Sequence, residues 1–418
     1  MTFMPLKPSA YADRTHPDFA AACRSWNLAF RHHPALVAEP TSIDEVAAAV
    51  AYARDNGLRV AIQSSGHGPV MEADGGAMLL SLRRMDSYRI NPAAATATLG
   101  GGAQWTSVLA EAQDSGLAPL VGSSPHVGAV GYSLGGGFGW LARRHGLAVD
   151  RVRALTVVLA DGSVVRATMF DNTELFWAML GGGAGTLGVV VEMETGLVPV
   201  TDVYAGNLFY PIDAAGDVFT FWRDWVEDVD PEFTSSFLLC AFPDLEAVPP
   251  PLRGRSFAIV RGCHCGDEED GQGLVDRWRA WRTPELDTFR TLPFRAMETI
   301  SNDPIDPIPA LSSGRWLSDP DRTTLSAMHN LLESGGMFAE IRHAGGATVW
   351  PMHCSRLGLP SWPASDSMPP SGPVGRTTVT SPPGPSGFWS WPRSAPRMRS
   401  VPRLPRWRGS KVGLSASV

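Results

Sequence analysis

Glycine is concentrated in three loops of this chain, and loops of that composition are suited to holding a dinucleotide. They run from Ser64 to Gly68, from Gly122 to Gly139 and from Gly181 to Gly188. A pyrophosphate group is bound by several backbone N–H donors at close range, and glycine permits this approach because it lacks a side chain and adopts positive φ. A single loop of this kind can equally be a tightly packed turn. Three of them, each beside an expected strand, favour a large dinucleotide ligand.

The usual nicotinamide-binding fold carries a G-x-G-x-x-G motif directly after its first strand, with an acidic residue about 20 residues later. This chain lacks that motif at the corresponding place. The dinucleotide is therefore expected to bind in another way.

His67 lies between Gly66 and Gly68 in the first of these loops. An imidazole is partly neutral at neutral pH, so one of its ring nitrogens can act as a nucleophile. The same histidine could instead hydrogen-bond to a phosphate or to the backbone. The residues alone leave both roles open.

The run Cys263-His264-Cys265 resembles half of a metal site. A zinc site needs three or four ligands, and no second Cys/His pair with suitable spacing follows. We therefore expect no metal, and we interpret the two cysteines as small apolar thiols on one face of a strand.

The elements that position these loops fall into two small α/β units and a third region. In the first unit, residues 36–90, Thr41 or Ser42 can cap a helix, and Glu45 completes a capping-box pattern with Ser42. Asn56-Gly57 is typical of the end of that helix. Strands are expected at Leu58–Ile62, Ala77–Leu82, Tyr88–Ile90 and Thr96–Leu99.

The second unit, residues 100–199, contains a predicted hairpin around Asp161-Gly162. Its other expected elements are helices at Trp105–Ser115 and Glu174–Leu180 and a strand at Val189–Met193. Residues 200–350 alternate strand-like runs (Tyr204–Tyr210, Phe237–Phe242, Ser256–Cys263) with helical ones (Val218–Val226, Gly273–Trp281, Asp321–Leu332). This pattern predicts an α+β domain with a mostly antiparallel sheet.

Several motifs, in matching order and spacing, resemble a known family. They are Pro34-Ala35-Leu36-Val37, Ser65-Gly66-His67-Gly68, Gly122-Ser123-Ser124-Pro125-His126-Val127-Gly128, Gly131-Tyr132-Ser133-Leu134-Gly135-Gly136-Gly137-Phe138-Gly139-Trp140, His145 to Asp150, Ala160-Asp161-Gly162, Glu174 to Ala178, and Gly181 through Val190. Residues 36–199 thus resemble the FAD-binding domain of the p-cresol-methylhydroxylase type, with two α/β subdomains. The body as a whole resembles the berberine-bridge-enzyme-like oxidases. The resemblance divides the chain into an N-terminal extension (1–35), this FAD-binding domain (36–199), a substrate domain (200–350) and a tail (351–418).

In this family the histidine of the first glycine loop is bonded to the flavin 8α-methyl group, and His67 occupies that position. The resemblance implies that FAD is held by Ser64, Ser65, Gly66, His67, Gly68, Gly122, Ser124, Val127, Gly128, Gly131, Gly135, Gly137, Gly139, Gly146, Asp150 and Val190. Some members add a second bond through a cysteine, but Ser124 stands there and is a far poorer nucleophile. A single covalent link is therefore expected. Ser65 and Gln63 also depart from the pattern, since they replace the usual glycine and arginine.

The resemblance implies an FAD-dependent oxidoreductase that takes a hydride from an alcohol, sugar or amine-type small molecule and passes electrons to molecular oxygen. The catalytic base is not identified; Arg261 and His264 are candidates, although each could be an ordinary surface or core residue. The alternatives are a flavin-binding protein with little turnover, because the family's C-terminal segment is missing from the tail, a dehydrogenase that uses another acceptor, and, more remotely, a dinucleotide binder without flavin.

The composition and charge of the 418 residues argue against several kinds of partner and cellular location. The net charge of −7 argues against a nucleic-acid partner. No apolar run reaches the length of a membrane span, and the first 20 residues lack the pattern of a secretion signal. Five scattered cysteines fit a reducing compartment, so we expect a cytoplasmic protein. The tail is rich in Pro, Ser and Arg and is predicted to be disordered, either as a natural basic tail or as the product of a shifted reading frame.

Overall fold

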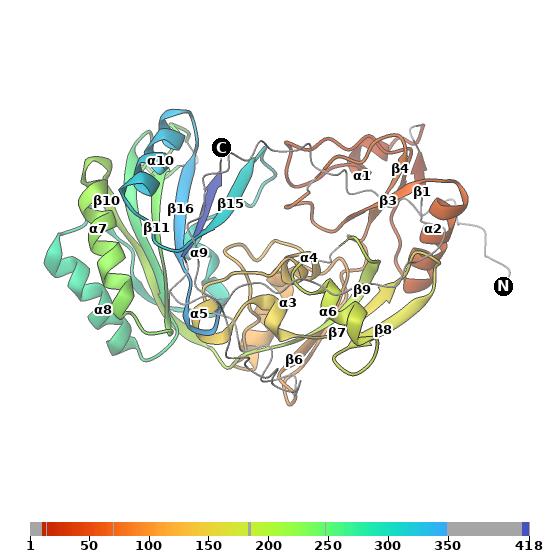
Figure 1. The fold of residues 1–418 in the computed structure, drawn as a ribbon, viewed down its shortest axis with the longest axis horizontal. Helices are drawn as coiled ribbons and strands as arrows, with labels where there is room; N and C mark the ends of the chain where they lie inside the picture. Colours follow the sequence, from red (N-terminus) through yellow and green to blue (C-terminus); the bar gives the residue numbers. More distant parts are fainter. Residues whose placement is uncertain are drawn as a thin grey trace, which may run out of the picture. The chain divides into compact units, whose positions relative to one another are not determined.

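The computed structural model describes residues 11–13, 15–69, 71–182, 185–246, 248–348 and 412–417. These residues form three β-sheets with helices packed on them (Figure 1). None of the helices in these ranges is long and apolar enough to cross a membrane.

The first sheet has the order β1-β2-β4-β3, and β2 and β3 both run parallel to β4. Its strands are β1 (Tyr11–Asp13), β2 (Leu36–Ala38), β3 (Arg59–Gln63) and β4 (Ala77–Ser81), and its helices are α1 (Phe19–Ala22) and α2 (Ile43–Asp55). The Ser42 side chain accepts a hydrogen bond from the Glu45 N–H, as a helix cap should. The Glu45 carboxylate accepts from the Thr41 N–H at 2.7 Å, one residue earlier than a standard capping box. Gly57 ends the helix with a φ of +66°.

The second sheet has the order β5-β6-β9-β7-β8 and is antiparallel throughout. Its strands are β5 (Tyr88–Asn91), β6 (Thr96–Gly100), β7 (Val152–Val158), β8 (Val164–Thr168) and β9 (Val189–Gly196). Its helices are α3 (Trp105–Asp114), α4 (Ala129–Leu134), α5 (Ala142–His145), the 3-10 turn η2 (Ala148–Arg151) and α6 (Thr173–Met179). The short helix α4 was not expected, because it lies inside the glycine-rich stretch whose composition predicts a loop.

The third sheet is the largest, with eight antiparallel strands. Its order is β13-β10-β12-β11-β16-β17-β15, and β14 pairs with β10. The strands are β10 (Asp202–Pro211), β11 (Phe233–Ala241), β12 (Ser256–His264), β13 (Leu286–Asp287), β14 (Arg290–Pro293), β15 (Ser312–Leu317), β16 (Phe338–His343) and β17 (Val412–Ser417). The helices are α7 (Ala215–Trp225), α8 (Glu268–Trp281), α9 (Glu298–Ser301) and α10 (Arg322–Glu333), with 3-10 turns η3 (Ile212–Ala214), η4 (Val226–Asp228), η5 (Phe294–Ala296) and η6 (Gly346–Thr348).

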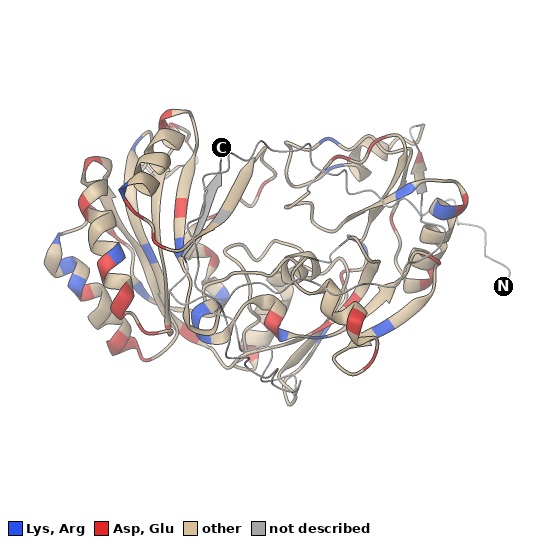
Figure 2. Cartoon of the chain, viewed as in Figure 1, with Lys and Arg blue, Asp and Glu red and all other residues tan. Residues whose placement is uncertain are grey.

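Helices α7, α8 and α10 cover one face of this sheet (Figure 1). Their apolar sides bury an aromatic core that includes Trp222, Trp225, Trp278 and Phe237. Charged residues of both signs lie along the outer sides of α7 and α8, which face away from the sheet (Figure 2). The α+β class and the mostly antiparallel third sheet confirm the fold predicted from the sequence.

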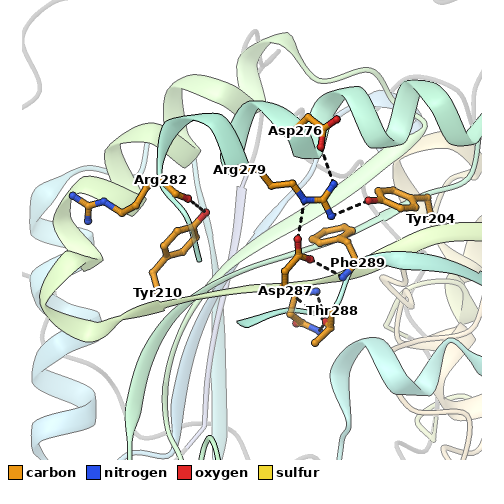
Figure 3. Close-up of polar contacts among 9 residues, drawn as sticks. Tyr204, Tyr210, Asp276, Arg279, Arg282, Asp287, Thr288 and Phe289 are labelled. Carbon is orange, nitrogen blue, oxygen red and sulfur yellow. Dashed lines mark hydrogen bonds and ion pairs between the residues drawn. The ribbon is translucent and has the colours of Figure 1, made fainter. Parts of the chain in front are cut away.

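A network of polar contacts fixes α8 to the edge of the third sheet (Figure 3). Arg279 on α8 donates to Asp276 and Asp287, each at 2.8 Å, and to the Tyr204 hydroxyl at 3.1 Å. Hydrogen bonds to these two carboxylates raise the pKa of Arg279 above its ordinary value, so it stays charged. Beside Asp287, the Thr288 hydroxyl accepts from the backbone N–H of Asn207 at 2.9 Å. The network therefore holds the backbone of β10 in place.

The predicted disorder of 351–418 falls mostly outside the described residues and stays a prediction. Within that range the structure describes the backbone of β17, which pairs with β15 and β16.

Candidate functional site

The His67 loop, residues 64–68, follows β3 and is held by the N-terminal segment. The Trp26 N–H donates to the Ser65 carbonyl at 3.3 Å, and the Asn27 N–H donates to the Gly66 carbonyl at 3.0 Å. Gly66 has a φ of +80°, and a Cβ there would lie 2.9 Å from the backbone of Ser25 and Trp26. Only glycine fits this contact without a shift of the backbone.

The His67 side chain is held on two sides. Its ring stacks on Trp26 with centroids 4.2 Å apart and planes 14° from parallel. Its Nδ1 lies 2.9 Å from the Ser65 hydroxyl, whereas its buried Nε2 has no hydrogen-bond partner among the described residues. Burial is the main cause that lowers the pKa of His67 to about 4. The imidazole is therefore neutral at neutral pH.

The second glycine loop meets the His67 loop at Gly128. The Gly128 N–H donates to the Ser65 hydroxyl at 3.0 Å, and a Cβ at Gly128 would lie 2.5 Å from the Ser64 hydroxyl. Backbone of this loop thus packs directly against the residues that flank His67. Ser124 and Val127, in the same loop, are half-buried.

The other glycines of the predicted site surround Tyr132 on α4. Gly137 has a φ of +76°, and a Cβ there would lie 2.7 Å from the Tyr132 ring. The buried Gly122 and Gly139 also lie against this ring. Two further glycines, Gly131 within α4 and Gly135 directly after it, are exposed.

Three further predicted residues lie in different settings. Asp150 accepts a hydrogen bond from the Leu147 N–H at 2.8 Å and lies against Gly146, which has a φ of +88°. Gly68 is exposed at the end of the His67 loop. Val190 is buried in β9 within the apolar core of the second unit.

A row of polar side chains crosses the third sheet on the face opposite α7, α8 and α10. Strand register places Arg261 opposite Asn207 and Ser236, and Ser236 opposite Arg342. Glu340, two residues before Arg342 on β16, lies on the same face. We call this set the polar row; its members are Asn207, Ser236, Arg261, Glu340 and Arg342. Alternate residues of β16, such as Ala339 and Ile341, point to the helices and are buried in the aromatic core.

Charge pairing stabilises the polar row. Arg342 donates to Glu340 at 2.7 Å, and Arg261 lies 3.7 Å from the other Glu340 oxygen. Arg261 also donates to the Asn207 side chain at 2.7 Å. Burial raises the pKa of Glu340, but the two arginines outweigh it, and the net pKa lies below the ordinary value. Glu340 is thus an ionised carboxylate although only 1% of it is exposed.

The polar row reaches the second glycine loop through Arg342. Its guanidinium donates to the Phe138 carbonyl at 3.3 Å and lies 6.0 Å from the centre of the Trp140 ring. A small pocket is lined by Ser123, Phe138, Gly139, Trp140, Thr234, Ser235 and Arg342. A glycine loop and the third sheet therefore line one pocket.

A family model described as an FAD binding domain matches residues 34–168. This chain contains an FAD-binding domain. The matched range includes the His67 loop and the second glycine loop, and ends before the third one.

Relatives of the FAD-binding domain are named as oxidases. The chain is 40% identical over 187 residues to the (R)-6-hydroxynicotine oxidase of Paenarthrobacter nicotinovorans, covering 44% of this chain and 40% of that protein. It is 36% identical over 189 residues to the chitooligosaccharide oxidase of Gibberella zeae, covering 43% and 38%. These alignments thus span less than half of each relative.

Solved structures extend the likeness over more of the chain. The 6-hydroxy-D-nicotine oxidase of Arthrobacter nicotinovorans has a TM-score of 0.71 at 26% identity, covering 82% of this chain and 76% of that one. The BBE-like 1 protein of Physcomitrella patens has a TM-score of 0.69 at 20% identity, which shows a shared fold.

The residues of the FAD-binding domain fit the cofactor. The backbone N–H groups of Gly66, His67 and Gly68 donate to no acceptor among the described residues, so they are free to bind phosphate oxygens. The buried, unpaired Nε2 of His67 is a polar atom that a bound group would satisfy. When bound, FAD supplies a ring that accepts a hydride.

The two residues considered as catalytic bases lie on opposite faces of the third sheet. Arg261 is a member of the polar row. His264 lies on the other face, where its ring is 5.9 Å from the Phe233 ring and close to Gly271 of α8. His264 therefore does not belong to the row that reaches the glycine loop.

Sequence reasoning missed Glu340, Arg342 and Trp26. The signal available for β16 was an acid and an arginine two residues apart between apolar residues, which is typical of a strand with one polar face. Trp26 carried no local signal, because its contact with His67 depends on the folding of residues distant in sequence.

In the parts of the chain that the structure describes, no group of three His, Cys, Asp or Glu is placed to hold a metal. Cys263 is buried, and burial raises the pKa of its thiol well above the ordinary value.

Proposed function

We propose that this protein is an FAD-dependent oxidase that takes a hydride from an alcohol, sugar or amine-type small molecule, with molecular oxygen as the acceptor. We also propose that FAD is attached by one covalent bond, at His67. The observation that carries the proposal is the buried, neutral and unpaired Nε2 of His67 in the glycine loop of an FAD-binding domain. The oxidase names of the relatives support the activity.

We propose one covalent bond to FAD rather than two because position 124 is a serine. Ser124 carries a hydroxyl, which is a far weaker nucleophile than a thiolate. The cysteine thiols among the described residues belong to Cys23, Cys240, Cys263 and Cys265, none of which lies in a glycine loop.

Glu340 is the residue of the polar row best suited to accept a proton from the substrate. It is ionised and buried, and it accepts a hydrogen bond from Arg342, which lines the pocket at the second glycine loop. Its Oε1 makes no hydrogen bond within the described residues. Arg261 and Arg342 keep the carboxylate ionised and fix its orientation.

A visible absorption spectrum, recorded before and after acid precipitation, tests the cofactor proposal. Flavin absorbance that stays with the precipitate supports the covalent link, and flavin recovered entirely in the supernatant contradicts it. Protein from riboflavin-replete cells that shows no flavin, and takes up none on soaking, contradicts flavin binding itself.

Peroxide release then tests the activity. Incubation with a panel of sugars, alcohols and secondary amines should give hydrogen peroxide with at least one of them. Flavin reduction without peroxide would indicate a dehydrogenase with another acceptor, and no reduction with any compound would indicate a flavin-binding protein without turnover.

A further inference from the structure

A buried cluster of three polar side chains lies where the N-terminal segment meets the end of β3. The Ser25 hydroxyl donates to the Gln63 side-chain oxygen at 2.6 Å. His32 Nε2 lies 3.0 Å from the Ser25 oxygen and 3.1 Å from the same Gln63 oxygen. Each of the three residues is at most 7% exposed. Gln63 is the last residue of β3, so the cluster lies directly before the His67 loop.

The contacts of His32 fix which ring nitrogen carries the proton. The backbone N–H of Ala73 lies 2.9 Å from Nδ1, and a backbone N–H can only donate. Nδ1 therefore holds the lone pair, and Nε2 carries the hydrogen that it donates to the Gln63 oxygen. The orientation of Gln63 agrees, because its side-chain nitrogen donates to the Arg24 carbonyl at 3.1 Å. Since Nε2 carries a hydrogen, His32 cannot take the Ser25 proton, and the pair is not a nucleophile with its base.

Residues 24–27 connect this cluster to the His67 loop. The first of them accepts the hydrogen bond from the Gln63 side chain, and the second is Ser25 itself. The last two donate their backbone N–H groups to carbonyls of the loop at 3.3 and 3.0 Å, and the Trp26 ring stacks on His67. The cluster therefore anchors the segment that holds the loop in place.

A second proton on His32 is incompatible with this arrangement. It would lie on Nδ1 and face the Ala73 N–H, and two donors cannot satisfy each other. Burial is the main cause that lowers the pKa of His32 below its ordinary value, so the ring is neutral at neutral pH. Among the charged groups that act on it, Glu72 favours the proton, whereas Arg83 and His33 oppose it. Proton uptake at low pH is thus coupled to loss of the Ala73 contact.

We propose that His32 is a pH-sensitive latch of the His67 loop. The neutral ring holds Ala73 and Gln63, and through Gln63 it holds residues 24–27 against the loop. The protonated ring gives up the Ala73 contact, the cluster opens, and the loop loses the support that keeps it in shape to bind FAD. This inference rests on FAD binding by the His67 loop, and not on the covalent bond or the oxidase activity of the proposed function.

Hydrogen exchange of the full-length protein, followed by mass spectrometry, tests the latch directly. Peptides that cover residues 24–33 and 71–75 should exchange about tenfold faster at pH 5 than at pH 7 after correction for the intrinsic rates, because each pH unit can shift the equilibrium up to tenfold. Peptides of β7 and β9 should keep their protection. Unchanged exchange of the first two peptides would overturn the proposal, as would an equal loss of protection in every sheet, which indicates global unfolding.

His32→Asn removes the titration and keeps an acceptor for Ala73, because its side-chain oxygen takes the place of Nδ1. In this variant the exchange of the same peptides should not change with pH. His329→Asn replaces a half-buried histidine on α10 and is the matched control, which should behave as the wild type. Equal pH dependence in His32→Asn and the wild type would assign the proton to another group and overturn the proposal. If His32→Asn fails to fold, the wild-type exchange pattern still decides.

The affinity for FAD is the second readout, measured in His67→Ala so that the flavin is exchangeable. The Kd for FAD, obtained from flavin fluorescence, should rise about tenfold from pH 7 to pH 5, and adding His32→Asn should remove the rise. FAD binding that does not depend on pH would overturn the latch and leave the proposed function intact. Absence of FAD binding at either pH would contradict both.

Discussion

The His67 loop and the polar row are built in opposite ways. The loop is one short stretch, in which the backbone N–H groups of Gly66, His67 and Gly68 donate to no acceptor among the described residues. The polar row takes one or two side chains from each of β10, β11, β12 and β16, and strand register places them together. Backbone recognition leaves a visible run of glycines in the sequence, whereas side-chain recognition leaves isolated polar residues in apolar strands.

The two regions also differ in how they keep their reactive groups. His67 is neutral because burial lowers its pKa to about 4, whereas Glu340 is ionised because Arg342 and Arg261 outweigh the effect of its burial. In the proposed function, burial prepares the nucleophile in the loop, and charge pairing prepares the proton acceptor in the row. If this division is correct, variants of the loop should change flavin attachment and variants of the row should change turnover.

The largest effect is expected from His67→Ala. Removal of the imidazole should abolish the covalent link, so that all flavin is released by acid, while the phosphate-binding backbone retains some flavin. Acid precipitation with absorbance at visible wavelengths measures this, and mass spectrometry of a tryptic digest of the wild type should show flavin on the peptide that contains His67. A flavin peptide that persists in His67→Ala would place the link elsewhere.

Glu340→Gln should leave the flavin attached and slow its reduction by substrate about 100-fold or more, the range for a lost general base. Anaerobic stopped-flow measurement of flavin bleaching gives this rate, for a substrate identified in the peroxide screen. Normal flavin content in the same preparation shows that the loop is unaffected. A reduction rate within about twofold of wild type would remove Glu340 from the chemistry.

Arg143 joins α5 to the segment that leads into β11 of the third sheet, and its loss should affect stability. It extends from α5 and donates to the carbonyls of Val229, Asp230 and Phe233. Burial lowers its pKa to about 10, so it remains charged. Arg143→Met leaves three carbonyls without their donor and should lower the free energy of unfolding by ~2–4 kcal/mol.

Urea denaturation measures this change, with Arg223→Met as the control. The Arg223 side chain is 41% exposed on α7, and its loss should change the free energy of unfolding by less than ~0.5 kcal/mol. Equal effects of the two variants would show that the buried contacts of Arg143 add nothing.

The smallest effect is expected from His343, next to the polar row on β16. Burial and the charge of Arg143 lower its pKa to about 3. Between pH 6 and pH 4 the unfolded chain binds a proton at this residue and the folded chain does not, so stability rises with pH in this window and is lost as pH falls. His343→Phe should reduce the slope by up to about 1.4 kcal/mol per pH unit. Unfolding curves at several pH values measure the slope, and identical slopes would contradict the lowered pKa.

The helix α2 and the His67 loop could be predicted from the sequence because their signals lie in neighbouring residues. Ser42 and Gly57 mark the ends of α2, and the glycines around His67 mark a ligand-binding loop. The helix α4 was missed because it has only six residues and contains Gly131, which lowers helix propensity. β16 was missed because its polar face alternates with its apolar face over only six residues.

The sequence by itself determined an FAD-binding domain, the loop that carries His67, and a third region with an antiparallel sheet. Those features depend on residues close together in the chain, so composition and spacing record them. Only the tertiary structure decided that Trp26 stacks on His67, that Ser65 joins His67 to Gly128, and that Arg342 carries the polar row to the second glycine loop. Each of those contacts joins segments far apart in the chain, and strand register and burial, rather than local propensity, bring them together.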